Sequence, residues 1–479
     1  MLFNSLEFLI FLPTVFLLYW FVFQKSLRVQ NLLLLISSYV FYGWWDYRFL
    51  SLIFLSTVID YFVGLKIHDS NDKKTKKSYL WISILFNLGL LGFFKYFNFF
   101  IDSWIDLLGA IGYEQTSTWT LNVILPIGIS FYTFQTMSYP LDIYHGKLKP
   151  TKDFVSFASF VSFFPQLVAG PIERASNLLP QILNNRIFKY LQGIEGLRLI
   201  LWGLFKKMVI ADNLASHVNI IFDNHISFNG GVLFIGLIYF SFQIYCDFSG
   251  YSDIAIGTAK LFGLELMSNF KFPYFAKDLS QFWKKWHISL STWFRDYLYI
   301  PLGGSKSGKL QSIKNLFIVF LISGMWHGAK WTFMVWGLIH AIFYVPIFLR
   351  KKYKINKSKK LKNNHILYQN ILKIGYTFTI TTIAWTFFRS SNVYEAFSYL
   401  SHAITNIAFP NSNREGIIFI FLLLLIEIGV HKNERDLFQY SWLKNKSRKR
   451  ILRILTYYIF IFFIFHFSKF EKPFIYFQF

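Results

Sequence analysis

The sequence has 479 residues, of which 54% are hydrophobic, 21% are aromatic and only 15% are charged. Lys and Arg number 49 against 25 Asp and Glu, so the formal net charge is +24. Charged residues make up about a quarter of an ordinary globular chain, so this composition excludes a soluble protein, a disordered chain and a nucleic-acid-binding domain. The single cysteine, Cys246, excludes a disulfide scaffold. The sequence predicts an all-α polytopic membrane protein, with the lipid bilayer as one of its partners.

The N-terminal segment has no positively charged start and no small-residue cleavage site, so we expect a retained first span. Apolar runs that could cross about 30 Å of hydrocarbon follow it along the chain. They lie near 31–45, 49–66, 79–100, 121–144, 154–170, 194–212, 231–246, 313–325, 331–349, 369–388, 416–430 and 451–467. The pattern predicts one membrane domain over 1–479, with a motif-bearing core near 120–345 and C-terminal spans near 365–470.

Three basic clusters flank apolar runs, at Lys73–Lys77, Arg350–Lys362 and Lys444–Arg453. Lys and Arg in membrane proteins gather in loops that stay on the cytoplasmic side. We therefore expect all three clusters to be cytoplasmic.

Residues 247–310 mix charged residues and tryptophans too densely for a free spanning helix. We expect this stretch to lie in the membrane interface or to re-enter the membrane. Irregular backbone at that depth must be buried in protein or line a watery cavity, because unpaired peptide groups are costly in lipid. A functional site is predicted in this stretch.

His327 lies between the apolar segments Leu316–Met325 and Trp331–Ile339, with Gly324 and Gly328 close by in sequence. One interpretation is a packed histidine that is hydrogen-bonded to a carbonyl. The other is a general base inside a cavity, since ionisable groups at membrane depth are costly and are functional candidates. Both interpretations stay open on the pattern alone.

His287 lies in a stretch whose composition favours an interfacial anchor, with aromatic belt residues and cations at headgroup depth. The same cations would also suit the phosphates of an entering acyl carrier or nucleotide. The aromatic residues are Trp283, Trp286 and Trp293, and the cations are Lys284, Lys285 and Arg295.

Several acids interrupt apolar runs, and such carboxylates generally pair with a cation or orient another side chain. A proton relay is one interpretation of them, and a structural ion pair is the favoured one. The acids are Asp60, Asp142, Asp247 and Asp253, and Glu173–Arg174 and Arg295–Asp296 are candidate local clamps. Cys246 is expected to be a small buried hydrophobe. No metal-ligand spacing occurs, so no metal centre is predicted.

Five strings together resemble the membrane-bound O-acyltransferase (MBOAT) family. They are LPIGISFYTFQTMSY at 125–139, FFPQLVAGPIER at 163–174, YCDFSGYSDIAIG at 245–257, FWKKWHISLSTWFRDYLYIPLGG at 282–304 and GMWHGAKWTFMVWGLIHA at 324–341. With the N-terminal LLLLISSYVFYGWWD, the resemblance covers about residues 1–345 and is closest to the branch that contains the membrane subunit of alginate O-acetylation.

The resemblance implies helices around a central funnel or tunnel, with the catalytic histidine at His327 and a second polar motif residue at His287. It also implies transfer of an acetyl group from a cytoplasmic thioester to a hydroxyl across the membrane. His327 would take the hydroxyl proton and return it to the thiolate. The candidate donors to the oxyanion are the indoles of Trp326 and Trp331 and the imidazole of His287.

The resemblance implies no bound cofactor, with acetyl-CoA or another acyl thioester as the consumed donor. Because the chain offers no large extramembrane domain, we expect an extracytoplasmic esterase-like or relay protein to receive the acetyl group. The polysaccharide acceptor stays open, and localisation in the inner (cytoplasmic) membrane is expected. Alternatives are D-alanyl transfer to teichoic acid, a non-enzymatic scaffold, and a transporter, although the sequence shows no internal repeat of the kind transporters usually have.

Overall fold

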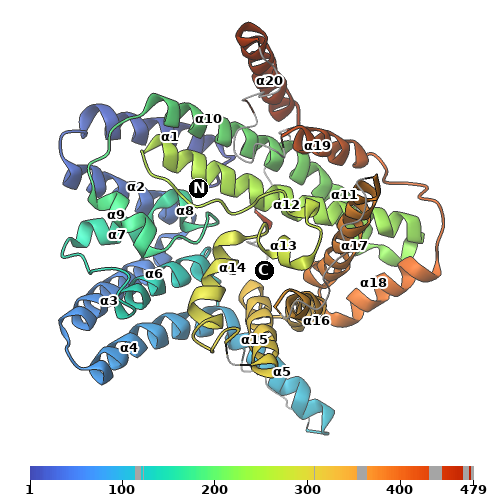
Figure 1. Ribbon diagram of the computed structural model, residues 1–479, viewed down its shortest axis with the longest axis horizontal. Coiled ribbons are helices and arrows are strands. Elements are labelled where there is room, and N and C mark those ends of the chain that lie inside the picture. Colours follow the sequence, from blue (N-terminus) through green and yellow to red (C-terminus); the bar gives the residue numbers. More distant parts are fainter. Residues whose placement is uncertain are drawn as a thin grey trace. The chain divides into compact units, whose positions relative to one another are not determined.

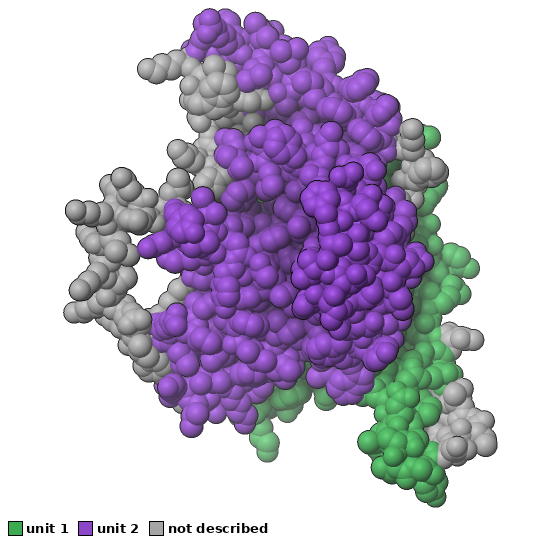
Figure 2. Space-filling view, turned by 90° about the vertical axis from the view of Figure 1, so that its right-hand side faces the viewer, with its two compact units in different colours: residues 1–197, 255–267 green, residues 198–254, 268–479 purple. Residues whose placement is uncertain are grey.

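The computed structural model describes residues 1–113, 120–121, 123–306, 308–352, 364–430, 438, 445–467 and 474–475. Helices dominate these residues, and none of them lies in a strand, which confirms the predicted all-α class. The chain forms two compact units, one made of residues 1–197 and 255–267 and the other of 198–254 and 268–479 (Figure 2). The single domain predicted over 1–479 stays a prediction.

Unit 1 is a bundle of helices in which α3 packs against α4 and α6, and α2 packs against α7 (Figure 1). Side-chain oxygens of Ser5, Ser26 and Asp72 cap helix N-termini in it. Its helices are α1 (Leu6–Leu17), α2 (Leu27–Asp46), α3 (Leu50–Asp69), α4 (Lys73–Leu91), α5 (Phe97–Ala110), α6 (Ile129–Tyr144), α7 (Phe154–Ser162), α8 (Phe164–Leu167), α9 (Ala175–Leu183) and the first part of α10 (Tyr190–Leu204).

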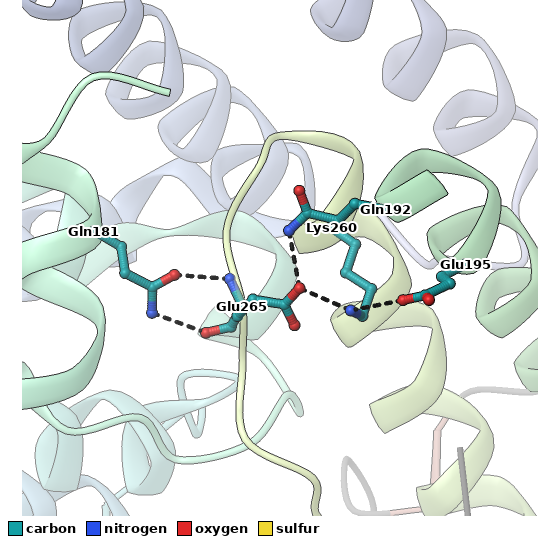
Figure 3. A network of polar contacts seen from close by, with 5 residues as sticks. All are labelled: Gln181, Gln192, Glu195, Lys260 and Glu265. Carbon is teal, nitrogen blue, oxygen red and sulfur yellow. Dashed lines mark hydrogen bonds and ion pairs between the residues drawn. The ribbon is translucent and has the colours of Figure 1, made fainter. Parts of the chain in front are cut away.

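Residues 255–267 are fastened to unit 1 by a polar network (Figure 3). The backbone N–H of Glu265 donates to Gln181, and the side-chain amide of Gln181 donates to the Glu265 carbonyl, at 2.8 and 3.0 Å. Lys260 and Gln192 both donate to the Glu265 carboxylate, at 2.8 and 2.9 Å. Lys260 also reaches Glu195 at 3.3 Å. The network ties this stretch to α9 and α10.

Unit 2 is built around α16, which packs against α13, α15 and α17 (Figure 1). Its helices are α11 (Asp212–Asp223), the larger part of α12 (Gly230–Leu261), α13 (Leu279–Trp283), α14 (Ile288–Phe294), α15 (Lys309–His327), α16 (Trp331–Lys352), α17 (Asn364–Arg389), α18 (Val393–Thr405), α19 (Ile417–Val430) and α20 (Lys446–Phe467).

Among the described residues, six helical stretches are long and apolar enough to cross a membrane. They are Leu27–Asp69, Lys73–Ala110, Gly230–Leu261, Trp331–Arg350, Tyr368–Arg389 and Lys446–Phe467, and shorter apolar helices cover Leu6–Val22, Phe154–Leu167 and Ile417–Val430. With six such stretches, the chain is a multi-pass membrane protein.

The predicted span 121–144 is wrong in extent, because α6 begins only at Ile129, after Gly128 with φ +77°.

The prediction that residues 247–310 all lie outside a spanning helix is also wrong in part. The long helix α12 continues through Asp247 and Asp253 to Leu261. Lys207 pairs with Asp247 at 2.8 Å and Lys206 pairs with Asp253 at 2.6 Å, so both charges are neutralised within the protein. Residues 262–306 form turns and short helices. Their predicted place in the membrane interface stays a prediction.

The three basic clusters are described to different extents. Lys73–Lys77 forms the start of α4. Of the predicted cytoplasmic loop Arg350–Lys362, residues 353–362 lie outside the described residues, and so does Lys444. Their cytoplasmic placement stays a prediction.

Candidate active site

His327 is the last residue of α15, at the point where the chain turns into α16. Glycines let these two helices approach closely. A Cβ at Gly324 would lie 2.3 Å from the carbonyl oxygen of Phe333, and one at Gly337 would lie 2.3 Å from that of Phe320. The close approach brings His327 beside Trp336 of α16.

His327 is only 3% exposed and is surrounded by aromatic rings. Its ring centroid lies 5.0 Å from those of Trp326 and Trp336, and 5.3 Å from that of Phe388 on α17. The His287 ring lies 6.3 Å away. The structure thus brings together the two histidines that the sequence analysis singled out, although 40 positions separate them in the sequence (327 − 287).

His287 is fully buried and precedes α14 in a left-handed conformation, with φ +42° and ψ +55°. Such a conformation is uncommon for a residue other than glycine, and it clusters at functional sites. The Phe248 ring packs edge-on against the imidazole at 4.7 Å. Nδ1 of His287 lies 3.1 Å from the side-chain oxygen of Asn269.

Burial lowers the pKa of His287 to about 3, because removal from water disfavours the charged ring. His287 lies outside the six candidate spans. The imidazole is therefore neutral near pH 7, and in a neutral imidazole one nitrogen donates and the other accepts.

The residues predicted to bind substrate divide into two groups. Trp326 lies beside both histidines, with ring-centroid distances of 5.7 Å to His287 and 5.0 Å to His327. Trp331, by contrast, is 55% exposed at the start of α16. Lys284 is exposed and Lys285 is half-buried. Arg295 is exposed and pairs with its neighbour Asp296 at 2.6 Å, which confirms the predicted local clamp.

The sequence analysis missed three buried polar residues that form a hydrogen-bonded group with His287. Asn269 and Ser252 are 1% exposed, and Ser289 is fully buried. Nothing in a single sequence links an asparagine in a loop to a histidine 18 positions later, because the link is made by folding.

His340 was missed as well, although it lies four residues after Trp336 on the same helix face. It is fully buried, and its ring lies 4.8 Å from Trp336 and 5.0 Å from Trp283. Neither ring nitrogen has a hydrogen-bond partner among the residues that the structure describes. The Trp–x₃–His spacing was the only available signal.

The acids in α12 form ion pairs, as the favoured interpretation predicted. Lys207 binds both Asp212 and Asp247, at 2.9 and 2.8 Å, and is 2% exposed. In unit 1, Asp142 lies 3.9 Å from Lys147. Cys246 is buried, in agreement with its expected role as a small hydrophobe. Within the described ranges, no cluster of three or more His, Cys, Asp or Glu side chains could hold a metal ion.

Two imidazoles in an aromatic, water-poor setting can accept a proton from a hydroxyl and pass it on. Residues 75–388 of the chain match the family described as "MBOAT, membrane-bound O-acyltransferase family".

Similar proteins include the probable alginate O-acetylase AlgI of Pseudomonas syringae pv. tomato, which is 39% identical over 83% of this chain and 74% of its own length. The peptidoglycan O-acetyltransferase of Helicobacter pylori is 34% identical over 100% of this chain and 98% of its own length. The teichoic acid D-alanyltransferase of Streptococcus thermophilus is 28% identical over 60% of this chain and 74% of its own length. The chain thus belongs to the membrane-bound O-acyltransferase family, and it is an O-acyltransferase.

Proposed function

We propose that this enzyme moves an acetyl group from a thioester donor to hydroxyls of a polysaccharide outside the cytoplasm. Support comes from relatives named for the O-acetylation of alginate and of peptidoglycan. The observation that carries the proposal is the buried pair of imidazoles, His287 and His327, 6.3 Å apart. Acyl transfer to a hydroxyl needs a group that removes one proton and returns it, and an imidazole does this near neutral pH.

In the proposed reaction the hydroxyl oxygen attacks the thioester carbonyl as its proton moves to an imidazole. The carbon–sulfur bond of the tetrahedral intermediate then breaks, and the proton passes to the departing thiolate. The family resemblance assigns the proton transfer to His327 and leaves His287 and the indole of Trp326 as candidate donors to the oxyanion. The donor, acetyl-CoA or another acyl thioester, is consumed as a substrate.

We propose that three cations bind the phosphates of the donor where it enters the site, namely Lys284, Lys285 and Arg295. Trp331 is proposed to line the same entrance. Cations that bind the donor equally in the ground state and in the transition state lower KM without raising kcat. A variant in which both lysines become alanine should therefore have a raised donor KM and an unchanged kcat. An unchanged donor KM would contradict this role.

We further propose that the enzyme lies in the inner (cytoplasmic) membrane and hands the acetyl group to an extracytoplasmic esterase-like or relay protein. A polymer must be held along several sugars, as grooves of soluble domains can do. If the purified enzyme alone acetylated a polysaccharide fragment, at a rate unchanged by added envelope proteins, transfer would be direct. The O-acetyl content of peptidoglycan and of exopolysaccharide in a deletion strain would identify the acceptor.

The proposal is tested by changing His327 to Ala. We expect polymer acetylation to fall by at least about 10²-fold, the usual contribution of a general acid–base group, while the protein inserts and accumulates normally. His68→Ala is the matched control, because His68 is an exposed histidine on α3 and should be dispensable. A His327→Ala enzyme that keeps more than about a tenth of wild-type acetylation contradicts the proposal. Transfer of D-alanine in place of acetate would favour the teichoic acid alternative.

A further inference from the structure

His340 is a fully buried histidine on α16 whose imidazole lies among four aromatic rings. Phe282 and Phe320 lie nearly parallel to it, at 6° and 16°, with ring centroids 6.2 and 6.3 Å away. Trp283 and Trp336 stand across it at 79° and 70°, with centroids 5.0 and 4.8 Å away. A phenyl ring has no hydrogen-bonding atom and an indole can only donate. None of the four side chains therefore offers a nitrogen or oxygen acceptor to the N–H group of the imidazole.

Ring nitrogens without partners gather around His340. Among the residues that the structure describes, neither nitrogen of His340 has a hydrogen-bond partner, and neither do the indole nitrogens of Trp283 and Trp336. The indole nitrogens of Trp286 and Trp385, whose rings are 4.9 Å apart, are unpaired as well. Buried indole and imidazole nitrogens usually find a partner, and leaving them unpaired costs stability. Such a concentration of unpaired donors indicates a ligand that carries acceptors.

His340 lies between His327 and a basic end of the α15–α16 pair. The ring of Trp336 is 5.0 Å from that of His327 and 4.8 Å from that of His340. Since four residues of an α-helix rise about 6 Å, His340 lies about one turn beyond Trp336 in the direction of the exposed Arg350. The two helices run antiparallel, so the exposed Lys309 at the start of α15 lies at the same end as Arg350.

A common class of acyl thioester offers the missing partners. Coenzyme A and acyl carrier proteins present the acyl group on a pantetheine arm, in which two methylene groups separate the sulfur from the first amide. The thioester carbon and this amide nitrogen are about 5 Å apart in an extended chain, which is similar to the 5.0 and 4.8 Å between neighbouring rings at His327, Trp336 and His340. An amide has one donor and one acceptor, and a neutral imidazole also has one of each.

We propose that His340 binds the first amide of a pantetheine-type arm while the acyl group lies at His327. This inference rests on the proposed acyl transfer and names the chemical class of its donor. The indole N–H groups of Trp283 and Trp336 supply further hydrogen bonds to oxygens of the arm, and the polar head of the donor lies toward the basic end. The buried nitrogens thus select the donor, at a cost to the stability of the ligand-free enzyme.

The first test compares three acetyl donors in the wild-type enzyme, assayed in membranes or purified with its partner. They are acetyl-CoA, S-acetyl-N-acetylcysteamine, which keeps only the first amide, and S-acetyl-pentanethiol, in which methylene groups replace that amide. The value of kcat/KM for the cysteamine donor should exceed that for the pentanethiol donor at least about tenfold, because a donor without the amide leaves the site's polar groups unpaired. A wild-type enzyme without this preference contradicts the inference.

The role of His340 is then tested by His340→Phe, which keeps a ring between Phe282 and Phe320 but has no nitrogen. We expect kcat/KM for acetyl-CoA and for the cysteamine donor to fall at least about tenfold, because the amide is then buried without its partner. The ratio between the cysteamine and pentanethiol donors should fall to within about threefold. A ratio that stays at its wild-type value would overturn the inference.

The stability of the ligand-free enzyme gives a second readout, which a merely structural histidine would move in the opposite direction. His340→Phe removes two nitrogens that have no partner, so the midpoint of thermal unfolding in detergent should equal or exceed that of wild type. His340→Leu is measured beside it, since a larger ring can strain a packed interior. A midpoint that falls clearly in both variants would show that the imidazole stabilises the enzyme itself, and the inference would fail.

His217→Phe is the matched control. His217 also belongs to unit 2, its Nδ1 has no partner among the described residues, and its ring packs against Tyr239 at 5.7 Å. This variant should keep the wild-type ratio between donors. The His327→Ala enzyme separates the two proposals, since it should be inactive with every donor. If it is active, the proposed function fails, and if it is inactive while His340→Phe keeps the wild-type ratio, only the assignment of His340 fails.

Discussion

Carboxylates inside the protein are stabilised in two ways, and two examples from each unit show the contrast. In unit 2, Asp247 and Asp253 bind the buried ammonium groups of Lys207 and Lys206, at 2.8 and 2.6 Å. In unit 1, Asp60 accepts hydrogen bonds from the hydroxyl of Ser83 at 2.5 Å and from the amide of Asn87 at 3.0 Å. Glu173 accepts from the side chain of Asn177 at 2.6 Å and from the backbone N–H of Met267.

The difference concerns what happens when one partner is lost. An ion pair satisfies full charges, so removing one member leaves the other charged and buried. Neutral donors satisfy the carboxylate without a counter-charge. Protonation of such a carboxylate leaves no unpaired charge in the protein, so it costs less stability than the loss of one member of an ion pair. We call Asp247, Asp253 and their lysines the ionic region, and Asp60, Glu173 and their donors the neutral region. The stability that the ionic region provides should be sensitive to mutation, and the stability that the neutral region provides should be sensitive to pH.

The largest effect on stability is expected for Lys207→Met, which leaves Asp212 and Asp247 without their shared cation. Breaking a buried ion pair in this way costs about 3–5 kcal/mol, so the midpoint of thermal unfolding in detergent should fall clearly. Lys260→Met is the control, because its partners Glu195 and Glu265 are about half exposed and such pairs contribute about 0–1 kcal/mol. Equal midpoints for the two variants would contradict the comparison.

An intermediate effect is expected from Glu173, which lies outside the candidate spans. Burial raises the pKa of its carboxyl from the ordinary 4.5 to about 7. The native state therefore holds a proton that the unfolded state releases near pH 4.5, so stability should fall as pH rises from about 4.5 to 7, by up to about 3 kcal/mol. Glu173→Gln should flatten this dependence of the unfolding midpoint on pH. An unchanged slope would refute the assignment.

The smallest effect is expected for Asp60→Asn. The replacement has the same shape and keeps an acceptor for Ser83, but its new NH₂ group faces the amide of Asn87, which costs about 1 kcal/mol. Asp247→Asn, which weakens the ionic region, should lower the unfolding midpoint more. If Asp60→Asn were the more damaging of the two, the neutral region would be the less tolerant one.

Sequence reasoning found the histidine pair because both residues lie in family-like strings, and the structure places His287 and His327 side by side. It also predicted that the acids of 245–257 form ion pairs. It stopped the helix too early, at residue 246, because the partner lysines Lys207 and Lys206 lie 40 and 47 positions before those acids (247 − 207 and 253 − 206). Hydropathy scores each residue alone and cannot detect a charge that is neutralised from another helix.

Asn269 could not have been predicted for the same reason. Its place in the site depends on hydrogen bonds to Ser252, which precedes it by 17 positions, and to His287, which follows it by 18. Neither spacing has a periodic meaning, because the chain from Ser252 to His287 is not one continuous helix or strand. The extent of α6 was likewise set by tertiary contact, since a Cβ at Gly128 would lie 2.9 Å from the Leu167 carbonyl oxygen.

The left-handed backbone of His287 constrains which replacements the position can accept. With φ at +42°, Asn, Asp and Gly fit with little penalty, whereas most other residues lose about 1–2 kcal/mol, and β-branched ones lose more. In a saturation library at this position, Asn should therefore accumulate best among the substitutions that keep a polar side chain, and Val and Ile should accumulate worst. Cellular abundance and catalytic rate would then rank the same library in two different orders, so that yield alone would be a misleading guide to which residues the chemistry tolerates.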